Sequence, residues 1–358
     1  MALERIATVE ELHEYLYAAL QLEHATIPPY LTALYSIHPG TNSDAFHVIR
    51  VVAVEEMLHL TLAANVLNAI GGTVDLTKRD FVPAYPAYLP DGETDFQVGL
   101  QPFSREAIET FIKIERPAAA PEEEARVMES GSKGSLPAHP GEETLRFYSI
   151  GEFYEEIARG LQQLEAERAK AGETLFVGDP ARQVTPEYYY SGGGEIIPVT
   201  DLDSAVAALR LIGEQGEGLG GAVYDHEGEL AHFYRFEQLL HGRYYQPGDQ
   251  ADDPTGPPLD IDWEAAYPAK PNPRVDDYPE GSELRDAAVE FNRQYASLLS
   301  LLTDSYNGRP ELLIDAVAEM FRVRDRMTSL FCNPIPGADG LTGAPTFEVA
   351  EFSGVVSA

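Results

Sequence analysis

The sequence predicts an all-α protein built on a four-helix bundle, with a long crossover, an insert before the fourth helix and extra helices after the bundle. Apolar residues recur with helical periodicity in four long segments. Two of these segments carry a Glu-x-x-His pair, and a single inward-facing glutamate precedes each pair. This order is how four-helix bundles supply a site for two metal ions. The six candidate ligands are Glu23, Glu56, His59, Glu152, Glu229 and His232.

The first two helices are expected at residues 9–37 and 44–70, and the second ends at Gly71-Gly72, a favourable helix stop. Glu23 occupies a position on the first apolar stripe where a leucine is expected. Glu56 and His59 interrupt the second stripe, and residues at i and i+3 share a helix face. Because an unpaired buried charge costs several kcal/mol, these groups need a cation or a hydrogen-bond network.

The positions of Glu23 and Glu56 support an antiparallel pairing of these helices. The connection centres near Gly40, so Glu23 lies 17 residues before the turn and Glu56 lies 16 residues after it. At about 1.5 Å per residue, the two carboxylates come level within roughly 2 Å.

The third helix is expected at residues 143–170, where Glu152, Glu155 and Glu156 compete for the inward position. Apolar and aromatic neighbours favour Glu152, and the other two remain open. The fourth helix is expected at residues 225–242, with Glu229 and His232 on one side. A core histidine paired with Glu229 is the alternative interpretation of His232.

A third Glu-x-x-His match, Glu10–His13, has a simpler explanation. It lies in the first turn of the first helix, behind Thr8, and Thr8-x-x-Glu11 predicts a capping box. Acidic residues also suit the helix dipole at this end. We therefore expect capping there and not metal chemistry.

Composition and irregular segments suggest the organisation of the chain. The crossover between the second and third helices is expected to carry a short helix at 104–114. The insert before the fourth helix has the size of a lid or pocket wall. The final helices are expected to pack on the bundle. The expected units are the bundle (1–245, with its crossover at 72–142 and insert at 171–220), a Pro/Asp-rich linker (246–280), a helical pair (281–332) and an irregular tail (333–358).

Charge and cysteine content exclude some classes of function. The formal net charge is -34, so nucleic acid and anionic membranes repel the chain. The single cysteine, Cys332, excludes an intrachain disulfide and suits a reducing compartment. No apolar run is long enough to span a bilayer, and the N-terminus resembles no signal peptide. A cytoplasmic protein is expected.

With these motifs identified, the chain resembles the ferritin-like domain of iminophenyl-pyruvate dimer synthases of the violacein and indolocarbazole pathways. The resemblance covers roughly residues 8–245. The matching stretches are Leu22-Glu23-His24-Ala25-Thr26-Ile27-Pro28-Pro29-Tyr30-Leu31, Glu55-Glu56-Met57-Leu58-His59-Leu60, Ile150-Gly151-Glu152-Phe153-Tyr154 and Glu229-Leu230-Ala231-His232-Phe233-Tyr234-Arg235-Phe236. It implies secondary metabolism, oxidative coupling of imines derived from aromatic amino acids, and the same six residues in ligand positions.

Carboxylates with two imidazoles suit two iron ions, or manganese next, better than structural zinc. The expected function is oxidation or oxygenation of a small, aromatic amino-acid-derived substrate with dioxygen or peroxide. The alternatives are a metal-storing or structural bundle and manganese-catalase-like peroxide disproportionation. The sequence leaves the substrate, homo-oligomerisation and a haem partner enzyme open.

Substrate is expected to enter beside Pro28-Pro29, because interior prolines free carbonyls and kink a helix. The alternative is that the kink only bends the helix around the crossover. Aromatic side chains suit the wall of an apolar pocket. The candidate pocket residues are Tyr30, Tyr85, Tyr88 and Tyr188.

Overall fold

The regular structure is helical throughout the described residues, with only isolated β-bridges between loops. The computed structural model describes residues 6–90, 95–117, 147, 149–190, 192–218, 222–225 and 228–350. The α-helices are α1 (Val9–Ser36), α2 (Ser43–Ala69), α3 (Arg105–Ile114), α5 (Ile150–Lys170), α6 (Leu202–Glu217), α7 (His232–His241), α8 (Glu283–Tyr306) and α9 (Leu313–Phe331). Short 3₁₀ helices are η1 (Pro180–Arg182), η2 (Pro186–Tyr188), η4 (Val275–Asp277) and η5 (Pro310–Leu312).

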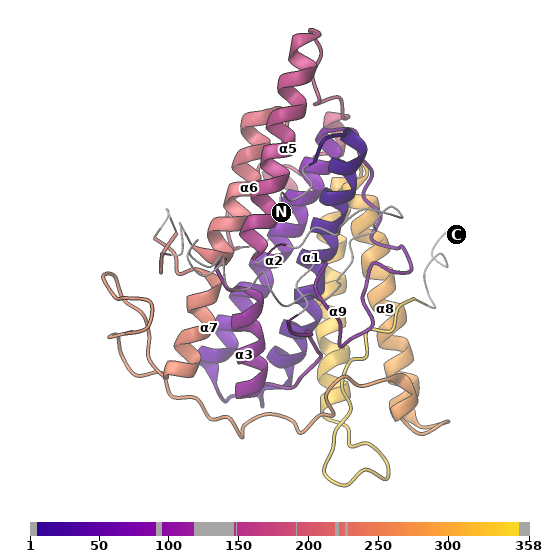
Figure 1. Ribbon diagram of the computed structural model, residues 1–358. Coiled ribbons are helices and arrows are strands. Elements are labelled where there is room, and N and C mark those ends of the chain that lie inside the picture. The colour runs from indigo at the N-terminus through magenta and orange to yellow at the C-terminus, as the bar shows by residue number, and fades with distance from the viewer. Residues whose placement is uncertain are drawn as a thin grey trace.

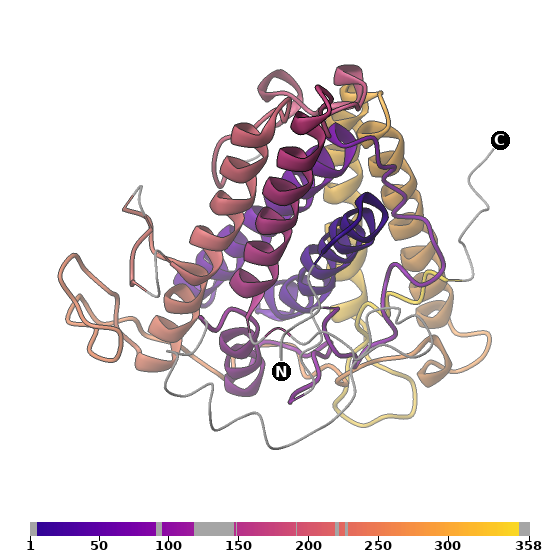
Figure 2. The same ribbon diagram turned by 45° about the horizontal axis from the view of Figure 1, so that its top comes forward.

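Helices α1 and α2 form the central antiparallel pair, and helices cover them on both sides (Figure 1). One side carries α5 and α6 with α3 and α7, and the other carries α8 and α9, as the tilted view also shows (Figure 2). Both central helices are therefore buried nearly all round, which matches their high apolar content. The predicted all-α bundle with extra C-terminal helices is confirmed.

The ends of the central pair follow the predicted signals. Thr8 accepts a hydrogen bond from the backbone of Glu11, whose carboxylate accepts one from the backbone of Thr8. This is the predicted capping box. At the same end of the hairpin, α2 ends at Ala69 with Ile70 as its C-cap, and the following Gly71 has a φ of +81°. The left-handed conformation explains why glycine ends this helix.

Four helical columns make up the bundle, and α1 and α2 are the first two. The third and fourth columns are each built from two helices placed end to end. In Figure 1, α3 lies in line below α5, and α7 lies in line below α6. Each of these two columns therefore has a break between its helices. The breaks lie at the same level, because the start of α5 contacts the end of α6: the Gly151 backbone donates a hydrogen bond of 2.5 Å to the Glu217 carboxylate. A Cβ at Gly151 would lie 2.6 Å from the same carboxylate, so glycine permits this approach.

The third predicted helix begins later than expected. Helix α5 starts at Ile150 behind the N-cap Ser149, while residues 143–146 and 148 lie outside the described part of the chain. Most of the crossover's second half, residues 118–142, also lies outside it.

The fourth predicted helix, at residues 225–242, is correct only in its second half. Tyr224 and Leu230 form an antiparallel bridge, and Asp225 donates a backbone hydrogen bond to Glu229. This pairing turns the chain before Ala231, so α7 starts at His232. Glu229 and His232 therefore do not share a helix face.

Segments outside the bundle pack against it closely. The predicted linker contacts the end of α1 through a hydrogen bond from the Tyr267 backbone to that of Ser36. Helix α8 is joined to α1 and α2 by buried polar contacts, including His24 to Tyr295 at 2.9 Å and Thr61 to Tyr306 at 3.0 Å. No helix in the described ranges is long and apolar enough to cross a membrane.

Candidate metal centre

Two groups of buried carboxylate and imidazole side chains meet at the level where the third and fourth columns break. One group is Glu23, Glu56 and His59, and the other is Glu56, Glu115 and His232. In each group the potential ligand atoms lie within 4.8 Å of one another. Glu56 belongs to both, so its carboxylate lies where it can bridge two ions.

Four helical columns supply this cluster. Glu23 comes from α1, Glu56 and His59 from α2, Glu115 from the C-cap of α3, and His232 from the first position of α7. Their side chains are at most 4% exposed, so the groups interact in a water-poor environment.

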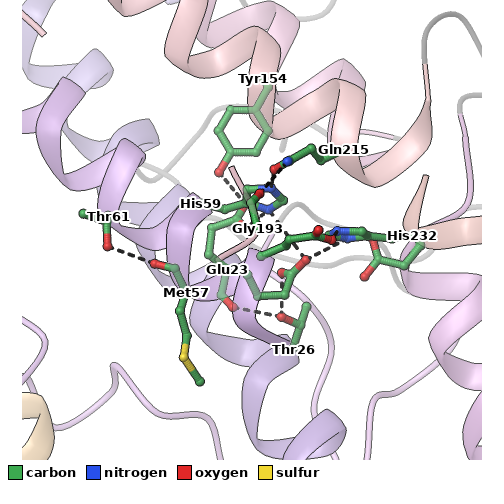
Figure 3. Close-up of polar contacts among 12 residues, drawn as sticks. Glu23, Thr26, Met57, His59, Thr61, Tyr154, Gly193, Gln215 and His232 are labelled. Atoms are coloured by element: carbon green, nitrogen blue, oxygen red, sulfur yellow. Dashed lines mark hydrogen bonds and ion pairs between the residues drawn. The ribbon is translucent and has the colours of Figure 1, made fainter. Parts of the chain in front are cut away.

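Both imidazoles present Nδ1 to the carboxylates. His59 Nδ1 lies 3.3 Å from Glu23 Oε2 and 3.6 Å from Glu56 Oε1. His232 Nδ1 lies 3.1 Å from Glu56 Oε1 and 3.5 Å from Glu115 Oε2. Figure 3 shows Glu23, His59 and His232 gathered around one point, with the Tyr154 hydroxyl directed at Glu23 and Gln215 behind His59.

Neighbouring residues fix each carboxylate. Thr26 donates a hydrogen bond of 2.8 Å to Glu56 Oε2, and Tyr154 donates one of 2.5 Å to Glu23 Oε1. The Tyr30 hydroxyl donates to Glu115 Oε1. Every carboxylate of the cluster therefore has a hydroxyl donor, which limits its rotation.

Burial and mutual contact shift the pKa values of these groups strongly. Burial alone lowers the pKa of His59, but contacts with Glu23 and Glu56 outweigh it and raise that pKa to about 10. Burial also lowers the pKa of His232, but contacts with Glu115, Glu55 and Glu56 outweigh it and hold that pKa well above its usual range. Burial raises the pKa of Glu23 to about 7. For Glu56, burial raises the pKa, but the two imidazoles outweigh it and hold the pKa well below its usual value. Without metal, the imidazoles are the cations that offset the carboxylates.

The donor set fits two transition-metal ions of intermediate hardness. Three carboxylates and two imidazoles are typical ligands of iron and manganese, and thiolates are absent from the cluster. His232 Nδ1 is buried and faces Glu56 and Glu115 at 3.1 and 3.5 Å, without a hydrogen bond of good geometry to any described residue. Once its proton is lost, this nitrogen and the two carboxylates would offer an ion three donor atoms close together.

The structure brings together four of the six predicted ligands: Glu23, Glu56, His59 and His232. Glu229 lies in the hairpin before α7, is 67% exposed and pairs with Arg235 at 3.2 Å. It is therefore outside both groups.

None of the three competing glutamates of α5 belongs to a group either. Glu152 is half-buried in the first turn of α5, where its backbone is capped by Ser149. Glu155 is exposed, and Glu156 binds Arg159 and the backbone of Ile6. What α5 contributes to the cluster is the hydroxyl of Tyr154.

Glu115 was absent from the sequence-based set because the short helix before it was assigned to the crossover. A signal for it exists. Ile108, Phe111 and Glu115 follow one another at helical spacing, and Ile108 and Phe111 are buried. A glutamate that continues the apolar stripe of a helix is the same feature that identified Glu23.

The four predicted pocket tyrosines have different positions. Tyr30 is buried in the cluster. Tyr85 is buried and donates to the Ala25 carbonyl, Tyr88 is half exposed, and Tyr188 lies on η2. Pro28 and Pro29 are buried inside α1, which continues as a helix through them, so substrate entry beside them remains a prediction.

Comparison with known proteins agrees with this architecture. The family model for ferritin-like proteins matches residues 16–241, which include every residue of the cluster. The chain belongs to the ferritin-like family. A ferritin-like protein from Caulobacter vibrioides has a similar fold, with a TM-score of 0.62 over 96% of this chain and 100% of that one at 21% identity.

Two characterised relatives are similar to this ferritin-like protein in sequence. Dichlorochromopyrrolate synthase from Lentzea aerocolonigenes is 27% identical over 321 residues, which are 84% of this chain and 29% of that enzyme. The 2-imino-3-(indol-3-yl)propanoate dimerase of Chromobacterium violaceum is 24% identical over 286 residues, or 76% of this chain and 22% of that enzyme. The chain therefore spans less than a third of either relative's length.

Proposed function

We propose that this protein is an oxidoreductase of secondary metabolism that would hold two iron ions, or manganese in their place, in the cluster that shares Glu56. The ligands would be Glu23, Glu56 and His59 for one ion, and Glu56, Glu115 and His232 for the other. The sharing of the buried Glu56 by two groups is the observation that supports this most strongly. Bound in this way, the ions would supply electron transfer to dioxygen or peroxide.

The protein's own residues would hold and isolate that centre. Thr26, Tyr30 and Tyr154 orient the carboxylates, and the four helical columns exclude water from them. In the metal-free protein, burial raises the pKa of Glu23 to about 7, so this carboxyl group would exchange its proton for an ion near neutral pH.

The relatives support a proposal for the substrate class. The dimerase of Chromobacterium violaceum is named for an imine that carries an indole ring. We propose that this protein also acts on an imine derived from an aromatic amino acid. Joining two such molecules by a carbon–carbon bond removes two electrons and two protons, which peroxide would accept to form two waters.

Metal content tests the ligand set. After anaerobic loading with Fe(II), the wild-type protein is expected to hold about two ions per chain. Glu56→Ala should lose both, and Glu115→Ala should lose one. Glu152→Ala and Glu229→Ala are matched controls that should retain both ions. Full occupancy in Glu56→Ala would remove the cluster as the metal centre.

Turnover tests the reaction. The loaded protein would be supplied with indole-3-pyruvate, ammonium ions and peroxide, and the products examined by mass spectrometry. A product with the mass of two imines less two hydrogens supports the proposal. Oxygen evolution from peroxide without substrate consumption would instead indicate catalase activity. A very large oligomer on gel filtration, with iron retained as a mineral, would indicate storage.

A further inference from the structure

The two imidazoles of the cluster have partners of different charge behind them. His59 Nε2 lies 2.9 Å from Oε1 of Gln215, at the end of α6, and His232 Nε2 lies 2.8 Å from Oε2 of Glu55, on α2. Gln215 is 7% exposed and Glu55 is 6% exposed, so solvent screens neither contact strongly. One histidine is therefore supported by a neutral amide and the other by a carboxylate.

Both contacts fix the tautomer of the ring. The Gly193 carbonyl can only accept, so the group of Gln215 that lies 2.7 Å from it is the amide nitrogen (Figure 3). The oxygen of Gln215 therefore faces His59 and accepts from its Nε2–H. The Glu55 carboxylate accepts from the Nε2–H of His232 in the same way. Each ring then presents the Nδ1 lone pair to the carboxylate cluster when it loses its second proton.

Gly193 lies against both Gln215 and Glu55. The Gly193 carbonyl holds Gln215, and a Cβ at Gly193 would lie 2.7 Å from Cγ of Glu55. Its φ of +94° also favours glycine. This residue lies in the insert between α5 and α6, so the insert contributes to the cluster through the residues behind the histidines.

We propose that the two metal positions are unequal, with the position of Glu56, Glu115 and His232 filling first and binding its ion more tightly than that of Glu23, Glu56 and His59. This rests on the proposed metal centre. A carboxylate behind an imidazole increases the basicity of the ligating nitrogen more than an amide does. Each position has two carboxylate ligands, one of them shared, so the ligands themselves do not create the difference.

Arg235 does not cancel the effect of Glu55. Its Nη2 lies 3.8 Å from Glu55 Oε1 but 3.2 Å from Glu229, so the guanidinium is shared between two carboxylates. Glu55 and Gln215 are positioning residues, because they act through the histidines and lie outside the ligand set.

Titration of the metal-free protein with Mn(II), with free Mn(II) followed by electron paramagnetic resonance, tests this order. The wild-type protein should bind two ions in separate steps, with dissociation constants about 10- to 100-fold apart. The tight step should persist in His59→Ala and disappear in His232→Ala. Two equal steps, or a tight step that survives in His232→Ala, would overturn the proposal.

Glu55→Gln tests the effect of the negative charge of Glu55 on His232, because glutamine keeps the size of the side chain and an oxygen that can accept the hydrogen bond. It should weaken the tight step about 10- to 100-fold and leave the weak step unchanged, so the two steps merge. An unchanged tight step in folded Glu55→Gln would contradict the role of the charge. Helical circular dichroism checks folding.

The same Mn(II) titration of Gln215→Leu, a variant on another helix, tests the proposal even if Glu55→Gln does not fold. This substitution should weaken only the weak step, and loss of the tight step alone would contradict the assignment. If the wild-type protein bound no Mn(II) or Fe(II) at all, the proposed metal centre itself would fail, which is a different outcome from two equal sites.

Discussion

The hydroxyl of Tyr154 on α5 donates a hydrogen bond of 2.5 Å to Oε1 of Glu23 on α1. Tyr30 on α1 contacts Glu115 at the end of α3 in the same way. The two outer carboxylates of the cluster thus each receive a tyrosine from a neighbouring column, and the shared Glu56 receives a threonine. These contacts tie α1, α2 and the column of α3 and α5 together at the level where that column is broken.

Tyr154→Phe should destabilise the protein by about 1.5–3 kcal/mol at pH 8, because a buried, ionised Glu23 loses a hydrogen-bond donor. Urea unfolding measures this change. Tyr306→Phe is a matched control, because the buried hydroxyl of Tyr306 contacts the neutral Thr61, and its loss should cost about 0.5–1.5 kcal/mol. Equal costs for the two variants would show that the charge of Glu23 contributes nothing to the contact.

Pro29 and Tyr85 should be energetically coupled. Pro29 has no N–H to bond the Ala25 carbonyl four residues earlier, and the hydroxyl of Tyr85 donates to that carbonyl at 2.8 Å. Tyr85→Phe alone should cost about 1–3 kcal/mol, because it leaves a buried carbonyl without a partner.

The same substitution should cost less in a Pro29→Ala background, where the alanine N–H can replace the tyrosine. A double-mutant cycle from urea unfolding measures this coupling. Additive effects would show that the two residues act independently.

The metal-free protein should lose stability as the pH rises from about 6.5 towards 10. The folded-state pKa of His59 is raised to about 10, so its contribution is fully present below the unfolded value of 6.5 and is lost as the pH passes through 10. His232 acts in the same direction. Unfolding free energies across this range should fall less steeply in His59→Gln.

Metal binding should displace these protons. At pH 7.5, loading both positions should release at least two protons per chain, one from each imidazole, because a ligating nitrogen must be deprotonated. An indicator dye in weak buffer measures the release, and His232→Ala should release fewer protons. Metal uptake without proton release would contradict the protonated state of the histidines.

His24 should destabilise the protein in acid. Burial lowers the pKa of His24 to about 3, so the unfolded chain takes up a proton below about 6.5 and the folded one does not. Stability is therefore lost as the pH falls from 6.5 to 3. Between pH 7 and pH 5 the wild-type protein should lose about 2 kcal/mol more than His24→Gln. A parallel decline in both proteins, measured by urea unfolding, would exclude this residue as the cause.

The sequence by itself determined the central hairpin and its half of the cluster. Glu23, Glu56 and His59 lie on two long, uninterrupted helices joined by a short turn, so their register follows from helix geometry alone. The capping box at Thr8 and the stop at Gly71 are equally local, because the groups they satisfy lie within a few residues in the chain.

The tertiary structure decided most of the other half, in which the sequence identified His232 but neither Glu115 nor the residues behind the histidines. Both remaining columns are assembled from two helices each, so their register depends on which short helices align in space. Glu115 reaches the cluster because α3 lies in line with α5, and Glu229 misses it because a hairpin ends before α7 begins. The contacts from Gln215 to His59 and from Glu55 to His232 likewise join distant segments. Periodicity within one segment carries no information about such pairings, because packing of separate elements around shared charges selects them.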